Sequence, residues 1–186
     1  MSNKNVFTGR LVIKTKRLAL TQMALKDTDN LFKMLSDKET AKYVGIQEKK
    51  KAIEKIIKVY LKRSKRGEGI LLKMATRKDN NFLGFFALPN YNDVHRRTEI
   101  GYTITKENWN KGYVSEAILT AVNFLFKKIK LNRLEAMVHP NNKVSLHLLN
   151  KFGFKKEGLV RQRYYMNNKP EDMVMLSLIR EEWNSK

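Results

Sequence analysis

The segment from Glu107 to Ile118, ENWNKGYVSEAI, places a lysine, a glycine and a serine where a predicted strand gives way to a predicted helix. A helix N-terminus presents unpaired N–H groups and a partial positive charge, so it can bind a phosphate group. Gly112 has no Cβ and would let the backbone approach a pyrophosphate closely, while Lys111 adds a cation and Ser115 a hydroxyl. The segment therefore predicts a phosphate-binding turn, unless Gly112 only permits a tight turn and Trp109 only packs on the core.

Other polar residues carry weaker signals. His139 and His147 are eight residues apart across a predicted strand–helix junction. Because no third ligand follows at metal spacing, we expect no metal site. Glu116 is expected to support the geometry of its helix rather than to act in catalysis.

The order of the predicted elements must position this turn. Apolar residues at 53, 56, 57, 60 and 61, for example, follow the spacing of one helical face. Periodicity and turn residues predict helices over 27–35, 48–66, 114–129 and 143–151, and strands over 17–23, 70–76, 82–88, 97–105, 134–138, 155–164 and 173–179.

The resulting order is β-α-α-β-β-β-α-β-α-β-β. It predicts a mixed α/β domain with three consecutive antiparallel strands and one βαβ crossover around Gly112. In such sheets, ligands bind at the carboxyl ends of strands beside a helix start.

Length and composition indicate one domain over residues 1–186. The hydrophobic fraction is 42%, and no apolar run approaches the roughly 20 residues that span a membrane. The N-terminus lacks the apolar segment of a secretory signal, and the chain has no cysteine. We therefore expect a cytoplasmic protein without membrane association.

The charge is strongly positive: 38 Lys and Arg residues against 18 Asp and Glu residues leave +20. This excess is consistent with solvated lysine-rich faces. It is also consistent with an anionic partner such as a phosphorylated cofactor, RNA or a ribonucleoprotein.

Three segments together resemble one enzyme family. WNKGYVSEAI, from Trp109, resembles the acyl-CoA-binding motif of the GNAT N-acetyltransferase superfamily, in the form W-G-K-G-Y-A-T-E-A of its ribosomal-protein alanine and serine N-terminal acetyltransferases. EIGYTI at 99–104 resembles the E-I-G-Y strand of that branch, and NKVSLHLLNKFGF at 142–154 resembles its N-x-x-S…GF segment. The resemblance covers roughly residues 18–179 and implies a GNAT-like fold whose sheet splays at the acyl-CoA site.

The resemblance also implies the residues that bind acetyl-CoA. Asn142 matches an asparagine that contacts the cofactor arm. Main-chain groups of the strand before the turn would hold the pantetheine and the thioester carbonyl, and the turn would hold the phosphates. The residues of the strand are Tyr102, Thr103 and Ile104. The residues of the turn are Asn110, Lys111, Gly112, Tyr113, Val114 and Ser115. Two positions depart from the family pattern, since Asn110 replaces a glycine and the β-branched Val114 replaces a small residue.

For the general base, the resemblance implies Glu99, which occupies the strand position from which family carboxylates take the amine proton, directly or through water. The alternative for Glu99 is a strand-surface pair with Arg96 or Arg97.

For the acid, many relatives have a tyrosine seven residues after the motif asparagine, but Leu149 stands there. Ser145, three residues after the asparagine, could instead hydrogen-bond the departing sulfur, or it could cap the first turn of its helix. Tyr164 and Tyr165 either line the acceptor groove or pack on the sheet.

These features predict an acetyl-CoA-dependent N-acetyltransferase acting on the N-terminal α-amino group of a protein, most plausibly a ribosomal one, with electrostatic attraction to ribosomal RNA. One alternative is acetylation of a small amine such as an antibiotic, a polyamine or an amino acid. A second is a basic RNA-binding or scaffolding protein that keeps the fold without activity. The sequence leaves the choice between monomer and homodimer open.

Overall fold

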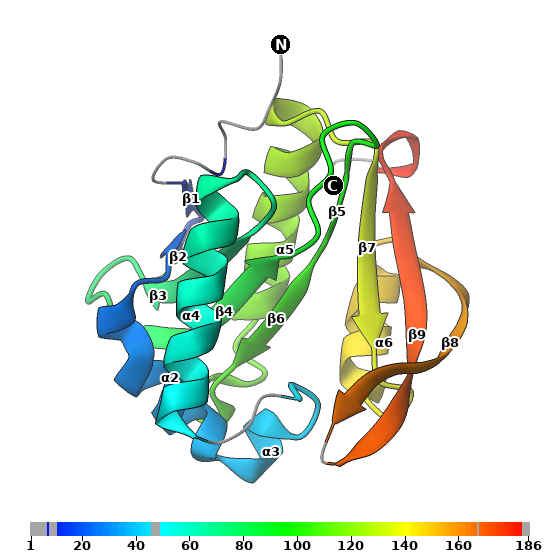
Figure 1. The fold of residues 1–186 in the computed structure, drawn as a ribbon. Helices are drawn as coiled ribbons and strands as arrows, with labels where there is room; N and C mark the ends of the chain where they lie inside the picture. Colours follow the sequence, from blue (N-terminus) through cyan, green and yellow to red (C-terminus); the bar gives the residue numbers. More distant parts are fainter. Residues whose placement is uncertain (1–6, 8–10, 46–48, 167, 184–186) are drawn as a thin grey trace.

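Short apolar strands build a five-stranded antiparallel sheet in the computed structural model, which describes residues 7, 11–45, 49–166 and 168–183 (Figure 1). All neighbouring strands pair antiparallel. In spatial order the strands are β1 (Val12–Lys14), β2 (Leu18–Gln22), β3 (Ile70–Thr76), β4 (Phe82–Leu88) and β6 (Gly101–Ile104). The predicted antiparallel run of three strands is thus confirmed as β3, β4 and β6.

A second, four-stranded sheet continues from the first. Its spatial order is β5 (Arg97–Glu99), β7 (Arg133–Val138), β9 (Lys169–Ile179) and β8 (Lys155–Met166). β5 runs parallel to β7, which confirms the predicted crossover, and the other pairs are antiparallel.

The single strand predicted over 97–105 belongs to both sheets, and this part of the prediction needs correction. Its first half pairs with β7 up to Ile100, whose N–H donates to the Glu135 carbonyl oxygen at 2.8 Å. Its second half turns away and pairs with β4. The strands β6 and β7 therefore diverge, as Figure 1 shows, and the predicted splay is the boundary between two sheets.

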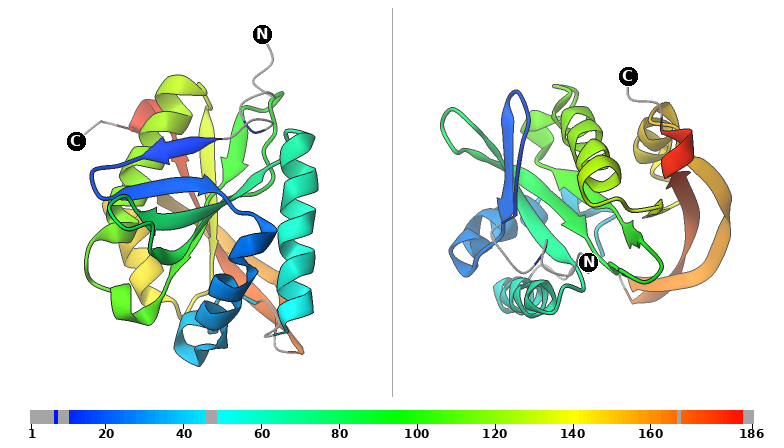
Figure 2. Two further views of the ribbon diagram at one scale, coloured as in Figure 1. Left: turned by 90° about the vertical axis from the view of Figure 1, so that its left-hand side faces the viewer. Right: turned by 90° about the horizontal axis from the view of Figure 1, so that it is seen from above.

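Helices cover both faces of the five-stranded sheet (Figure 2). On one face lie α2 (Thr28–Ser36) and α4 (Lys50–Lys65), and on the other lies α5 (Tyr113–Asn123). α6 (Lys143–Lys151) packs beside the second sheet, and α3 (Lys38–Ala41) follows α2. Short 3-10 turns complete the chain at η1 (Leu25–Asp27), η2 (Lys106–Asn108) and η4 (Arg180–Glu182).

Two apolar clusters hold these layers together. Ile53 and Ile57 of α4 pack with Leu31 of α2 on one face of the first sheet. Ile118 and Val122 of α5 belong to a larger cluster on the other face, which also takes in the second sheet. Successive side chains of a strand point to opposite faces of its sheet, so β4 contributes residues to both clusters.

Several boundaries differ from the predictions. The helix expected over 114–129 ends as an α-helix at Asn123 and continues as a π-helical turn, η3 (Phe124–Lys128). The helix expected over 48–66 begins at Lys50, and Glu48 lies outside the described residues. β1 and α3 were not predicted, because elements of three or four residues carry too little periodicity. No helix within the described ranges has the length and apolar character needed to cross a membrane.

Candidate active site

The divergence of β6 from β7 opens a cavity of about 460 Å³ between the two sheets. Four predicted site residues line it together: Glu99, Tyr102, Asn142 and Ser145. Thr103 and Ile104 continue along β6, which is the terminal strand of its sheet. Residues 110–112 form the turn beyond it and residues 113–115 begin α5, and none of these six lines the cavity. The site thus divides into a reaction cavity and a separate turn.

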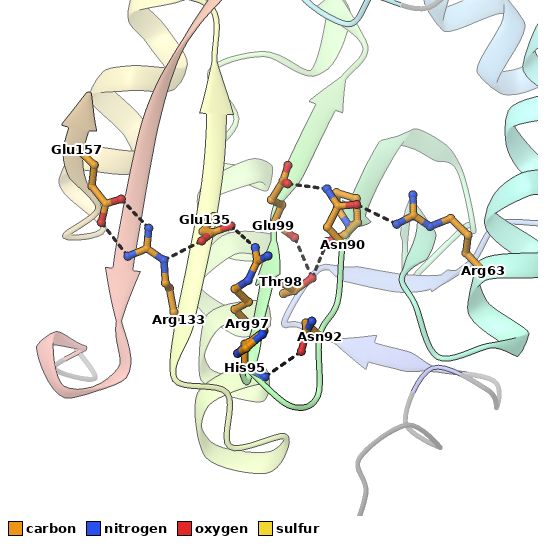
Figure 3. A network of polar contacts seen from close by, with 11 residues as sticks. Arg63, Asn90, Asn92, His95, Arg97, Thr98, Glu99, Arg133, Glu135 and Glu157 are labelled. Atoms are coloured by element: carbon orange, nitrogen blue, oxygen red, sulfur yellow. Dashed lines mark hydrogen bonds and ion pairs between the residues drawn. The ribbon is translucent and has the colours of Figure 1, made fainter. Parts of the chain in front are cut away.

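Glu99 lies on the wall of this cavity and is only 6% exposed. Its Oε1 accepts a hydrogen bond of 2.6 Å from Nδ2 of Asn90, and Oδ1 of Asn90 accepts one of 2.9 Å from Arg63 (Figure 3). Arg97 does not pair with Glu99, because its guanidinium bonds Glu135 at 2.8 Å. Of the two arginines considered as surface partners in the alternative for Glu99, Arg97 thus pairs elsewhere, and no ion pair joins Arg96 to Glu99 within the described residues. Glu99 is instead a buried carboxylate with an amide donor.

Ser145 faces the same cavity from the first turn of α6. Asn142 caps this helix, since its Oδ1 accepts from the Ser145 N–H at 3.1 Å. Capping by the Ser145 hydroxyl is therefore wrong: its Oγ lies 2.9 Å from the phenolic oxygen of Tyr102. Leu149, at the position of the family tyrosine, is fully buried.

Tyr102 and Ser145 share a hydrogen bond between their hydroxyl groups in which either oxygen can be the donor. Burial raises the pKa of Tyr102 to about 12, although the hydrogen bond with Ser145 acts in the opposite direction. The phenol therefore keeps its proton at neutral pH and can donate it to the Ser145 oxygen. In that direction of the bond, the Ser145 hydroxyl can donate its own proton to a third group in the cavity.

The turn before α5 has the backbone of an anion-binding site. Asn110 and Gly112 adopt left-handed conformations with φ of 59° and 75°, and Gly112 is the N-cap of the helix. Because this N-cap has no side chain, it cannot accept from the N–H groups of the first turn. Val114 packs against the core as a partly buried residue. The geometry fits the pyrophosphate of a nucleotide cofactor.

Glu116 anchors this turn to the first sheet, which confirms its predicted structural role. Its carboxylate accepts hydrogen bonds of 2.7 Å from the Arg17 backbone N–H and 2.6 Å from Arg17 Nε, and it also bonds the Thr15 hydroxyl. Arg17 in turn donates to the Lys111 carbonyl oxygen at 2.9 Å. The same guanidinium lies 4.4 Å from the centroid of the Tyr113 ring.

Aromatic residues complete the cavity, and sequence reasoning recognised only some of them. Tyr164 and Tyr165 line it, in agreement with the first of the two alternatives considered for them. Tyr43 and Tyr60 also line it but were not predicted. The sequence does not mark Tyr60 as a site residue, because its spacing also fits the buried face of its helix. Asn90 follows the strand predicted over 82–88, in a segment whose composition indicates only a turn.

Comparisons with known proteins agree with this geometry. The acetyltransferase (GNAT) domain family matches residues 17–155. The uncharacterised N-acetyltransferase YoaA of Bacillus subtilis is 35% identical over 175 residues, which are 91% of this chain and 97% of YoaA.

Solved structures share the fold. The ribosomal-protein-S5-alanine acetyltransferase of Vibrio fischeri superimposes with a TM-score of 0.75 at 17% identity, covering 94% of this chain and 99% of its own. RimL, a ribosomal L7/L12 α-N-protein acetyltransferase, superimposes with a TM-score of 0.82 at 15% identity, covering 91% of this chain and 94% of its own.

The family match and the relative YoaA thus define the class of the protein as an acyl-CoA-dependent transferase. The chain belongs to the GNAT acetyltransferase family and is an acetyl-CoA-dependent N-acetyltransferase.

The contacts by which Glu116 anchors the turn before α5 give a first prediction. Burial acts to raise the pKa of Glu116, but hydrogen bonds from Thr15 and Arg17 outweigh it, so the pKa is lowered. The stabilisation is therefore complete above about pH 4.5, the usual range of a free carboxyl, and is lost as the pH falls below it. Glu116→Gln should lower the free energy of unfolding at pH 7 by about 1–3 kcal/mol in urea titrations and weaken acetyl-CoA binding.

Glu107→Gln is the matched control, because Glu107 is an exposed carboxylate in the same segment. It should change neither quantity. Equal stability of Glu116→Gln and the native protein at pH 7 would contradict the anchoring role.

Proposed function

We propose that this N-acetyltransferase modifies the α-amino group at the N-terminus of a protein, and that a ribosomal protein is the acceptor. The observation that carries the proposal is the acidic content of the cavity: among its lining residues within the described chain, Glu99 is the single carboxylate. A polyamine carries several positive charges and would call for several carboxylates, whereas one amine needs one. The ribosomal-protein acetyltransferases of the same fold and the +20 charge support a ribosomal acceptor.

In this proposal Glu99 takes the proton of the attacking amine, directly or through one water, because only the uncharged amine is nucleophilic. Acetyl-CoA, when bound, supplies the acetyl group as a thioester. The new C–N bond forms as the C–S bond breaks. Ser145 donates a hydrogen bond to the departing thiolate, which then takes a proton from solvent, while Glu99 releases to solvent the proton that it took from the amine. Tyr102 positions Ser145 through their shared hydrogen bond, and donation from the phenol to Oγ, one of its two possible directions, would point the Ser145 proton toward the cavity.

Thiol release from acetyl-CoA tests the acceptor class. Peptides that begin with Ser or Ala should release CoA, whereas the same peptides with a blocked N-terminus should not. Spermidine, aminoglycosides and free amino acids should react much more slowly. Release with small amines alone would contradict the proposal in favour of a small-molecule acceptor.

Replacing the base should affect turnover rather than cofactor binding. Glu99→Gln should lower kcat by about 100-fold or more, because general-base catalysis typically contributes that much. The shape of the pH–rate profile should also change, while the Kd for acetyl-CoA stays within about twofold of the native value, which is less than the loss of one hydrogen bond would cause. Unchanged turnover together with an unchanged pH profile would remove Glu99 from the mechanism.

The Tyr102–Ser145 pair should behave as one unit. Ser145→Ala should lower kcat by about tenfold or more, and Tyr102→Phe by less, with similar acetyl-CoA affinity in both. Because Tyr102 acts through Ser145, the double variant should be no slower than Ser145→Ala. Multiplicative losses in kcat would show that Tyr102 acts independently of Ser145.

A further inference from the structure

A second groove of about 760 Å³ adjoins the active-site cavity. Its lining comes from the end of α4, from the segment between β4 and β5, and from β7, β8 and β9. Glu99 and Met137 line both spaces. A chain whose amino group lies at Glu99 can therefore continue into the second groove without leaving the protein surface.

Three arginines and three glutamates line this groove, but only some of their charges are balanced within it. Arg97 pairs with Glu135 at 2.8 Å, and in the proposed function Glu99 faces the amino group of the acceptor. Two guanidinium groups, Arg63 and Arg163, and one carboxylate, Glu68, remain. Within the described part of the chain, neither of these arginines has a carboxylate at salt-bridge distance. One acidic group would balance the excess.

The two arginines belong to similar pairs on two different elements. The Arg63 guanidinium lies 5.7 Å from the Tyr60 ring centroid on α4, and that of Arg163 lies 5.6 Å from the Tyr164 ring centroid on β8. Both tyrosines line the active-site cavity, and both arginines line the second groove. Each Arg–Tyr pair therefore connects the wall of the active-site cavity to the wall of the second groove.

The position of Arg63 is fixed more firmly than that of Arg163. Arg63 donates to Oδ1 of Asn90 at 2.9 Å and is partly buried, whereas Arg163 is exposed (Figure 3). A planar guanidinium presents two parallel donors to a carboxylate, so these side chains suit an acidic group better than a neutral one.

We propose that the second groove binds the residues that follow the amino terminus of the acceptor, and that Arg63 and Arg163 bind an acidic side chain among them. The preferred acceptor is then a protein N-terminus with an aspartate or glutamate shortly after the first residue. This inference rests on the proposed N-terminal acetyltransferase activity and narrows its acceptor class.

Matched peptides test the inference. Hexapeptides that begin with Ser and carry one Glu at position 2, 3 or 4 are compared with peptides that carry Gln there, using kcat/KM from thiol release. At one or more positions the Glu peptide should be preferred by about tenfold or more, the ratio expected from one charge-assisted hydrogen bond. Arg163→Met should bring this ratio to within about twofold of one, a difference of under 0.5 kcal/mol.

Arg161→Met is the control, because Arg161 is exposed on the same strand but does not line the groove. It removes the same charge and should keep the native ratio. Arg163 is used rather than Arg63 because Arg63 also bonds Asn90, the partner of Glu99.

Two results would overturn the acidic subsite and leave the proposed function standing: acetylation of Glu and Gln peptides at equal rates by the native protein, or an unchanged ratio in Arg163→Met. Absence of thiol release with every peptide would instead reject the proposed function. Fluorescence anisotropy of labelled Glu and Gln peptides then tests the subsite directly, and equal affinities would overturn it as well.

Discussion

The structure depends on one strand that pairs with two different sheets. Up to Ile100 the chain is held by β7, and from Gly101 onward it is held by β4. A strand cannot follow both partners once they diverge, so one edge of β6 loses its neighbour and a cavity opens beside it. Glu99 and Tyr102 lie on either side of this division, which is why one short segment supplies both a carboxylate and a phenol to the site.

Local signals were sufficient for the framework of the site. The glycine turn, its helix and the three antiparallel strands follow from spacing and residue type, because each depends on neighbours in the chain. The resemblance of three short segments to one family then placed Glu99, Asn142 and Ser145, and the structure brings them to one cavity. The division of the strand over 97–105 had no local signal, because it depends on which distant strand lies on each side.

The contacts that define the chemistry were beyond sequence reasoning for the same reason. Tyr102 and Ser145 are 43 residues apart, and only the fold brings their hydroxyl groups together. Asn90 lies in a segment whose composition indicates nothing more than a turn, yet its amide holds Glu99. A side chain that orients another side chain produces no periodic pattern in the sequence.

The contacts from Arg63 through Asn90 to Glu99 join the second groove to the active-site cavity. Asn90 uses both ends of one amide, since its Oδ1 accepts from Arg63 while its Nδ2 donates to Glu99. A rotation of the Arg63 side chain would therefore be passed to the Glu99 carboxylate through a single rigid group. Filling one of the two spaces would thus alter the orientation of a side chain in the other.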